Sequence, residues 1–477
     1  MPLIVAIVIL GYFTLLILIS HFTSKNAGPS DFYTASRSSK WYLVAFGMVG
    51  ASLSGVTFIS VPGEVANSSF HYFQVVLGYL LGYWVIAKVL IPIYYKLNLV
   101  SIYTYLEQRF GFWSYKTGAF FFLLSRIIGA SFRLFLVAGV LQIAFFDPMD
   151  LPFWVAVMST IILIWLYTFR GGIKTIVWTD TLQTTFMLIA VIVSIYFMKN
   201  ELSWTWSELI SNVIRDERAT IFDWDWRHGT NFFKQFFSGA FIAIVMTGLD
   251  QDMMQKNLTC KNSREAQKNI FWFCIILVVV NLLFLSLGVL LYQFAEVRAF
   301  SIPEQSDSLF PSLAVNHFSL FGTITFLLGI TAAAYSSADS ALTALTTSFC
   351  VDFIGFNRDN FSRKSKTRML VHLGFSLILF VTILVFEAIN DKSVINSIFI
   401  AAGYTYGPLL GLFAFGILTK WEVKDKYVPI VSVLSPALSY LINANSKILL
   451  GGYQFGFEIL ILNGLIMLFG LWLVRKK

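Results

Sequence analysis

The chain has 477 residues, of which 57% are hydrophobic and only 13% are charged, against about 25% charged residues in a typical soluble domain. This composition excludes a soluble catalytic or regulatory domain of any size and predicts an all-α polytopic membrane protein. The net charge of +8 is explained by loops on one side of the membrane, so it does not indicate nucleic-acid binding.

Apolar stretches of roughly 20 residues recur along the whole chain, and each can cross ~30 Å of hydrocarbon as a helix. We predict thirteen transmembrane helices, at approximately 2–22, 41–61, 71–95, 117–145, 151–169, 174–198, 232–252, 270–295, 312–352, 369–388, 394–419, 427–442 and 454–474.

Lys and Arg fall mainly in every second loop, with 23 in one set of loops and 8 in the other. Positively charged loops stay in the cytoplasm, so the N-terminus is predicted to face out and the C-terminus in. An odd number of helices requires the two termini to lie on opposite sides of the membrane, which agrees with this orientation. We expect a multi-pass protein of the plasma (inner) membrane.

Setting aside the first helix and the last two leaves ten helices in two groups of five. Because five is odd, the second group enters the membrane from the opposite side, which is the layout of an inverted repeat. The predicted parts are a leading helix with its loop, the first repeat, an outer-face loop, the second repeat and two trailing helices, at 1–40, 41–198, 199–231, 232–420 and 421–477.

The second predicted helix contains glycines and hydroxyl residues that weaken it, which favours a break near the middle of the membrane. A break frees backbone carbonyls, and those of Gly50 and Leu53 are candidates for binding a hard cation. The hydroxyls of Ser52, Ser54 and Thr57 are then available to a polar solute. The alternative is that these hydroxyls bond back to their own helix.

The ninth predicted helix carries Ala333, Ser336, Ser337 and Ser340 at i, i+3, i+4 and i+7, so these residues share one face. Together with the break in the second helix they predict an oxygen-rich site without a carboxylate, which suits a monovalent cation. Asp339 points to the neighbouring face and either anchors the helix or serves a second ion.

Charged residues inside membrane helices are costly and need a reason. Arg126 is a candidate for bidentate pairing with a substrate carboxylate. Arg133 competes with it, and one of the two is expected to be structural. Asp180 is a cation exit step, a ligand of a second ion, or a partner for a Lys or Arg at the inner end. Lys88 is expected to extend its ammonium to the membrane surface.

No catalytic constellation is visible. The five histidines have no metal-binding spacing, the three cysteines do not pair by spacing, and we find no P-loop or nucleophile elbow. We therefore expect no enzyme activity. The expected partners are Na⁺, a small polar solute and the lipid bilayer, with no nucleic acid and no obligatory protein partner.

These motifs resemble the sodium/solute symporter family, which includes carriers of sugars, proline, iodide and sialic acid. The resemblance spans roughly residues 40–420 and implies a LeuT-like fold with ten core helices in two inverted repeats. Its main motifs are Ala333-x-x-Ser336-Ser337 and the run from Phe58 to Gly63. Supporting motifs are Gly171-Gly172-Ile173-Lys174, Trp178-Thr179-Asp180 and Thr247-Gly248-Leu249-Asp250-Gln251.

The resemblance also implies specific ion ligands. The sodium site falls on Gly50, Leu53, Ala333, Ser336 and Ser337. A second sodium site, present in some members, falls on Asp180 with Ser336 and Ser340. Asp339 and Gln251 are lesser candidates.

For the substrate, Ser52, Ser54 and Thr57 are similar to a Thr-x-Ser-x-x-Thr pattern in sialic-acid carriers. The same comparison assigns the remaining contacts to Phe70 or Phe73, Gln74 and Arg126. The protein is thus predicted to import sialic acid or a neutral sugar or polyol together with Na⁺. The closest rivals are a proton-coupled carrier, with Asp180 or Asp339 as proton site, and a carrier of an amino acid or other organic anion.

Overall fold

The computed structural model describes residues 2–24, 37–99, 101–168, 173–356, 365–389 and 393–476. Within these ranges the chain is helical, and the only extended pairing is two isolated β-bridges, Ser39 with Cys260 and Val423 with Arg475. Gly171 and Gly172 of the predicted family motif lie outside the described residues.

The first half of the chain forms one leading helix and then a group that begins with a broken helix. The bounds are α1 (Pro2–Ser24), α3 (Trp41–Ser52), α4 (Gly55–Ser68), α5 (Tyr72–Val85), η3 (Ile86–Leu90), α6 (Ile91–Lys96), α7 (Thr104–Arg109), α8 (Phe112–Leu141), η4 (Gln142–Phe146), α9 (Phe153–Thr168) and α10 (Ile173–Glu201).

The second half follows a short loop helix and also begins with a broken helix. The bounds are α11 (Trp206–Arg215), α12 (Phe232–Ala243), η7 (Ile244–Gly248), α13 (Gln251–Asn257), α14 (Ser263–Val297), η8 (Ser306–Ser308), α15 (Leu309–Asn316), α16 (Leu320–Ser348), α17 (Ser365–Ile389), α18 (Val394–Thr405), α19 (Gly407–Leu418), α20 (Val428–Ala444), α21 (Ser446–Leu449) and α22 (Ile459–Leu473).

Length and hydropathy identify membrane-spanning helices in the described chain. Seven segments are long and apolar enough to cross a bilayer, and the number rises to nine if the two bent pairs each count as one span. The bends are 72° between the segments 232–248 and 251–257, and 49° between α18 and α19. The protein is therefore a multi-pass membrane protein in which the predicted spans 232–252 and 394–419 are interrupted.

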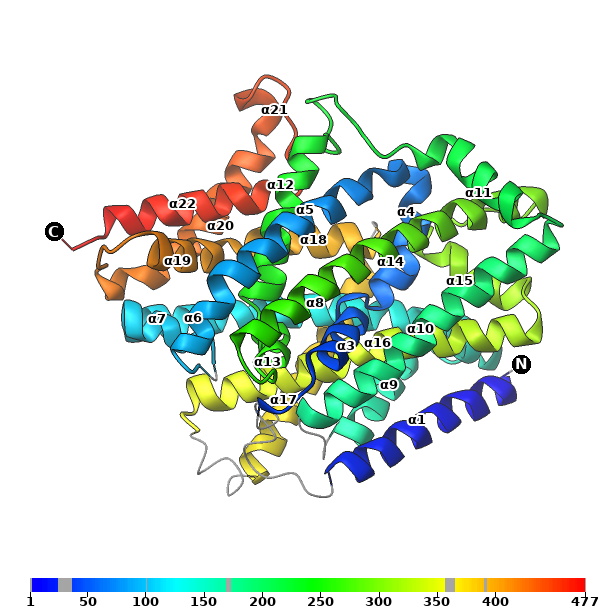
Figure 1. The fold of residues 1–477 in the computed structure, drawn as a ribbon, viewed down its shortest axis with the longest axis horizontal. Coiled ribbons are helices and arrows are strands. Elements are labelled where there is room, and N and C mark those ends of the chain that lie inside the picture. Colours follow the sequence, from blue (N-terminus) through cyan, green and yellow to red (C-terminus); the bar gives the residue numbers. More distant parts are fainter. Residues whose placement is uncertain are drawn as a thin grey trace.

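Long helices run side by side through the centre of the molecule (Figure 1). α16 is almost entirely buried and packs against α10, α8 and α3. α1 lies at one side, against α10, and α22 lies at the other, against α19 and α20. The buried position of α16 places its polar face in the interior of the bundle.

Two helices from different halves touch through their backbones. A Cβ atom on Gly78 of α5 would lie 1.9 Å from the carbonyl oxygen of Phe236, and one on Gly239 of α12 would lie 2.0 Å from that of Val75. Only glycine fits at such an approach. Gly239 is thus a packing residue, whereas Gly248 lies at the bend that separates α12 from α13.

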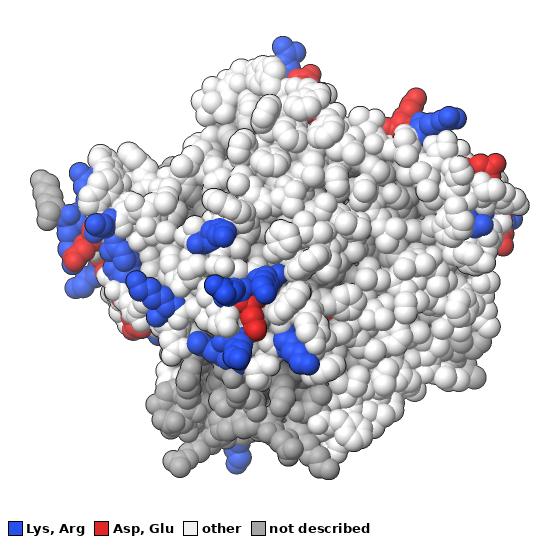
Figure 2. Space-filling view, viewed as in Figure 1, with Lys and Arg blue, Asp and Glu red and all other residues white. Residues whose placement is uncertain are grey.

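The surface separates into a wide uncharged zone and two charged ends (Figure 2). Lys and Arg gather over the end where α6, α7 and α13 lie, while the opposite end, near α11 and α15, carries both signs. At that mixed end Arg218 pairs with Asp216 at 2.8 Å and Glu296 at 2.9 Å. The Arg218 guanidinium lowers the pKa of the Asp216 carboxyl below its ordinary value.

Candidate functional site: a broken helix facing a polar helix face

The predicted break in the second helix is present and lies between α3 and α4. Leu53 leaves the helix with φ −80° and ψ 62°, and Ser54 is extended with ψ −179°. Leu53 N donates to Val49 O and Phe58 N to Ser54 O, but within the described chain no backbone amide donates to the carbonyl of Gly50 or Leu53. The break therefore leaves two backbone oxygens available to a ligand.

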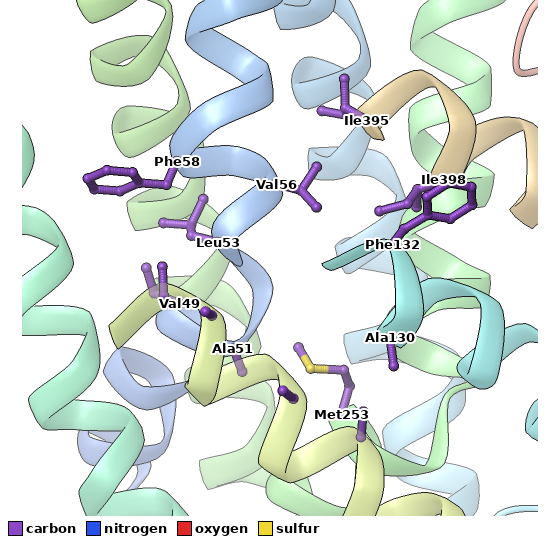
Figure 3. Close-up of a cluster of buried hydrophobic side chains, with 14 of the residues drawn as sticks. Val49, Ala51, Leu53, Val56, Phe58, Ala130, Phe132, Met253, Ile395 and Ile398 are labelled. Atoms are coloured by element: carbon purple, nitrogen blue, oxygen red, sulfur yellow. The ribbon is translucent and has the colours of Figure 1, made fainter. Parts of the chain in front are cut away.

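The hydrophobic side chains around this break hold it in place (Figure 3). Val56 and Phe58 point to opposite sides of α4, and Phe58 stacks on Phe310 with ring centroids 5.4 Å apart. Val49 and Leu53 are fully or almost fully buried. Apolar packing on both sides thus fixes the polar backbone of the break within the bundle.

The polar face of α16 lies opposite the break. A Cβ atom on Gly55, the first residue of α4, would lie 4.0 Å from Cα of Ala334. Ser336 and Ser337 are completely buried, and the Ser337 hydroxyl donates to the carbonyl of Ala334 at 3.0 Å. Each serine oxygen keeps lone pairs for a further partner. The set predicted from the sequence, Gly50, Leu53, Ala333, Ser336 and Ser337, is thus drawn from two elements that contact each other.

This donor set fits a sodium ion. It consists of neutral oxygens on a broken helix and on a buried helix, and hard cations prefer oxygen ligands. The two backbone carbonyls at the break lack an amide partner, so an ion there would satisfy groups that are costly to leave unpaired inside a membrane.

Gly50 is needed for a reason that the sequence did not reveal. A Cβ atom at this position would lie 2.1 Å from Oγ1 of Thr184 on α10. That hydroxyl donates to the carbonyls of Asp180 at 2.7 Å and Phe46 at 3.2 Å, so it cannot move freely. Thr184 on α10 therefore leaves no room for a side chain at position 50.

Asp180 lies next to the predicted sodium ligands, but both its carboxylate oxygens already have partners. Oδ1 accepts from the Ser336 hydroxyl at 2.8 Å, and Oδ2 pairs with the ammonium of Lys256 at 2.8 Å. The sequence had placed Lys256 among the cytoplasmic loop charges. The structure instead buries its side chain to 1% exposure in α13. The Asp180 carboxylate is thus already neutralised by a side chain of the protein.

The remaining ion candidates are also buried. Among the residues that the structure describes, the hydroxyl oxygen of Ser340 has no hydrogen-bond partner, while the Asp339 carboxylate accepts from the backbone amide of Ser340. Gln251 accepts from the backbone amide of Ile102 at 2.9 Å, which ties α13 to the segment before α7. Gln251 is thereby a positioning residue of the inner end.

Beside the break is a cavity of about 90 Å³, and the three hydroxyl residues predicted to contact a solute line it together. They are Ser52, Ser54 and Thr57. The other walls come from α5, α8, α12, η7, α13, α14 and α18. The rest of the lining includes Tyr72, Tyr79, Tyr83, Arg126, Arg133, Asn281 and Phe399.

The two arginines of this cavity differ in their partners. Arg126 is 6% exposed, forms an ion pair with Asp252, and lies 3.7 Å from Asp250, which in turn accepts from the Tyr406 hydroxyl at 3.0 Å. Arg133 forms no ion pair in the described chain, and its Nε has no hydrogen-bond partner. Within the described residues, Arg126 is thus neutralised by carboxylates, whereas Arg133 has no ion pair.

Three predicted substrate contacts lie away from the cavity lining. The Gln74 amide donates to the carbonyl of Thr230 at 2.8 Å and accepts from the amide of Asp223 at 3.2 Å, so it holds the outer loop. Phe70 and Phe73 are buried in the packing near the start of α5. Tyr72, one position from Phe73, takes the aromatic place in the cavity instead.

Tyr72 also closes one end of the cavity. Its ring stacks on Phe399 of α18 with centroids 6.2 Å apart, and its hydroxyl lies 3.3 Å from that of Tyr79. Tyr72, Tyr79 and Tyr83 recur at i, i+7 and i+11, which places them on one face of a helix. That periodicity is the sequence signal from which the aromatic wall was predictable.

Comparison with known proteins agrees with this architecture. A model of the sodium:solute symporter family matches residues 32–422. The chain belongs to that family. It is 24% identical over 419 residues to the sodium/sialic acid symporter NanT of Aliivibrio fischeri, covering 84% of this chain and 80% of the relative. It is 26% identical over 407 residues to sodium-coupled monocarboxylate transporter 1 of Mus musculus, covering 82% of this chain and 64% of the relative.

A solved structure of a Na⁺-coupled sialic acid symporter, in a substrate-bound outward-open state, has the same fold. The TM-score is 0.82 over 99% of both chains at 19% sequence identity. The family and these relatives are transporters rather than enzymes, and sodium is the coupling ion in their names. Against the monocarboxylate transporter the chain spans less than two thirds of the relative's length.

Proposed function

We propose that this protein imports a small polar solute that carries a carboxylate, driven by the sodium gradient, with sialic acid as the leading substrate. The observation that carries the proposal is the unpaired guanidinium of Arg133 in the same cavity as three hydroxyls, directly beside the neutral oxygens of the sodium site. A partly buried guanidinium without an ion pair matches a carboxylate by its bidentate geometry.

Sodium would be held by the carbonyls of Gly50, Leu53 and Ala333 and the hydroxyls of Ser336 and Ser337. The ion supplies positive charge that ties the broken helix to α16. Because the cavity hydroxyls belong to the same break, ordering it by sodium favours solute binding, and solute binding favours sodium to the same degree. Each charge that moves inward at 100 mV adds about 2.3 kcal/mol of driving force.

Closure on the two sides of the cavity involves different contacts. Tyr72 and Phe399 stack at one end, where only aromatic rings need to separate. At the other end Arg126, Asp250 and Asp252 form a buried ionic floor joined to Tyr406. We assign the aromatic end to the outer gate and the ionic floor to the inner gate of an alternating-access cycle.

Several features support the finer topology. The seven long segments, two bent pairs and four shorter apolar helices in the described chain overlap all thirteen predicted spans, and the segment Gly55–Lys96 overlaps two of them, 41–61 and 71–95. The basic end in Figure 2 would face the cytoplasm, with the N-terminus out and the C-terminus in. The two broken helices would then open inverted repeats at 41–198 and 232–420 in a plasma-membrane protein.

A second candidate substrate is a smaller organic anion. It is favoured by the similarity to a monocarboxylate transporter, because sialic acid and a monocarboxylate share the group that Arg133 would recognise. Neutral sugars and polyols lack that group, so they leave Arg133 without a partner in the loaded cavity.

The experiment is a thermal-stability measurement on the purified protein with sialic acids, monocarboxylates, amino acids and neutral sugars, each with and without Na⁺. A ligand that binds only the folded state raises the melting temperature. A shift that needs both an acidic solute and Na⁺ supports the proposal. A shift produced by a neutral sugar alone contradicts the role of Arg133, and uptake driven by a pH gradient without Na⁺ identifies the proton-coupled alternative.

A further inference from the structure

We propose that Lys256 replaces a second sodium ion, its ammonium acting as a tethered cation on Asp180, so that the protein binds a single Na⁺ for each solute. The inference rests on the proposed sodium site and concerns the ion stoichiometry at its edge. It follows from the positions of Lys256, Asp180 and Ser336, which come from three helices, α13, α10 and α16.

The ion pair is enclosed on all sides. The side chains of Lys256 and Asp180 are each 1% exposed, and Ser336 is completely buried. The Lys256 ammonium lies 2.8 Å from Oδ2 of Asp180, and the Ser336 hydroxyl donates to Oδ1 at 2.8 Å. Each carboxylate oxygen of Asp180 therefore has one partner from the protein, and the cationic one is Lys256.

The position of Asp180 explains why a cation is needed there. A Cβ atom on Gly47 of α3 would lie 3.3 Å from the Cβ of Asp180, so the carboxylate is held against the broken helix. A buried carboxylate without a counter-charge is strongly unfavourable. Either a bound ion or a protein side chain has to neutralise it, and Lys256 does so from within the chain.

The position of Lys256 is itself fixed. The Asn257 amide next to it donates to the carbonyl of Met253 at 3.1 Å, and its side-chain oxygen accepts from Asn269 at 2.6 Å. The Thr259 hydroxyl donates to the carbonyl of Lys256 at 2.7 Å. The end of α13 is thus bonded to α14 and to its own turn, which aims the lysine into the bundle.

Two other carboxylates act on Lys256 at longer range. They are Asp252, which already pairs with Arg126, and Asp339, whose oxygen accepts from a backbone amide of α16. Both carboxylates thus add to the attraction that holds the Lys256 ammonium in place. An additional sodium ion on Asp180 itself would meet the ammonium at contact distance and be repelled.

The test counts sodium ions on the purified protein without solute, by equilibrium binding of radioactive ²²Na⁺ and by the steepness of sodium-dependent thermal stabilisation. The variants are Lys256→Gln, Lys256→Gln with Asp180→Asn, and the matched control Lys88→Gln, which removes an exposed membrane lysine. The first leaves Asp180 charged and unpaired, whereas the second removes both charges together.

We expect one Na⁺ per chain and a Hill coefficient near one for the wild type, the Lys88 variant and the double variant. Lys256→Gln is expected to bind a second Na⁺ with a steeper, cooperative dependence, and to be stable only at high Na⁺. If Lys256→Gln does not fold even then, the wild-type and double-variant counts decide: one ion in each supports the inference.

Two bound ions on the wild type, or one ion with an unchanged Hill coefficient on folded Lys256→Gln, would overturn the inference but leave sodium coupling intact. No sodium binding by the wild type would instead overturn the proposed function. The two failures are therefore distinguishable by the same titration.

Discussion

The two broken helices at the centre of the molecule differ in the chemistry of their interruptions. Between α3 and α4 the interruption carries no charged residue, and its backbone carbonyls face hydroxyls on α16. Between α12 and α13 the chain turns by 72° and places Asp250, Asp252 and Lys256 in the interior, each paired with a side chain from another helix.

The difference shows how similar interruptions acquire separate tasks. A break that leaves neutral oxygens unpaired is open to an exchangeable ion. A break whose charges are neutralised by arginine, lysine and tyrosine is closed within the protein and joins helices together. Four variants test this difference between the two breaks, and they follow in order of decreasing expected effect.

The largest effect is expected for Arg126→Met. It leaves Asp250 and Asp252 buried without their counter-charge, which typically costs about 3–5 kcal/mol of folding free energy. The measurement is the apparent melting temperature of detergent-solubilised protein. Arg133→Met is the matched control, because Arg133 has no ion pair to lose. Equal melting temperatures for the two variants would contradict the idea that ion pairs with Arg126 stabilise the break between α12 and α13.

Gly50→Ala is expected to damage the first break by overpacking. The added methyl would collide with the Thr184 hydroxyl, a change that costs about 1–3 kcal/mol and displaces a sodium ligand. We expect the sodium concentration for half-maximal stabilisation to rise. Combining it with Thr184→Ala removes the collision and should restore much of the affinity, with Thr184→Ala alone as the control. A double variant no better than Gly50→Ala would contradict this assignment.

Arg133→Met should affect the solute rather than the ion. Loss of a charged hydrogen bond of about 1.5–3 kcal/mol predicts a 10- to 100-fold weaker affinity for an acidic solute. The sodium titration without solute should be unchanged, and Arg133→Lys should recover part of the solute affinity. Calorimetric titration with the solute and with Na⁺ measures the two affinities separately. An unaltered solute affinity would contradict this role of Arg133 and would favour Arg126 as the residue that binds the carboxylate of the solute.

The smallest effect concerns Asp307, in the loop helix η8 that packs against the far end of α4. Burial raises the pKa of Asp307 to about 6 from its ordinary value of 3.8. The folded protein therefore binds the proton more tightly than the unfolded chain, and stability rises as pH falls through 6.

Asp307→Asn imitates the protonated form and keeps an acceptor for the amide of Val394. It should stabilise the protein at pH 8 by no more than about 2 kcal/mol, allowing for solvent screening of a half-buried group. The gain should vanish near pH 4. Melting temperatures of the variant and wild type across this range provide the measurement, and a gain that persists at pH 4 would exclude the carboxylate as its cause.

The local features that the proposed sodium site uses, a broken helix and a hydroxyl-bearing helix face, were predictable from the sequence because they depend on local patterns. The spacing of Ala333, Ser336 and Ser337 places them on one face of any α-helix, and the Gly and Ser content around Leu53 weakens helix locally. Helix positions were predictable for the same reason. The resemblance to the sodium/solute symporter family, drawn from those motifs, is confirmed by the family match.

The partners of charged residues were not predictable, because they depend on contacts between distant segments. Arg126 and Arg133 are seven residues apart and share a helix face, so periodicity does not separate them. Only the bend before α13, which brings Asp252 to Arg126, does so. The same bend buries Lys256. In the sequence this lysine follows an apolar stretch, so its position alone predicts a charged residue in an exposed loop.

The glycine contact between α5 and α12 has a mechanical consequence. The backbones of α5 and α12 touch with no side chain between them. Because such close packing resists displacement, these two helices should move together as one rigid body. The chain regains freedom only past Gly248, where α12 gives way to α13. Motion during transport would then concentrate at the bend after Gly248, and α13 would rotate relative to the rigid pair of α5 and α12.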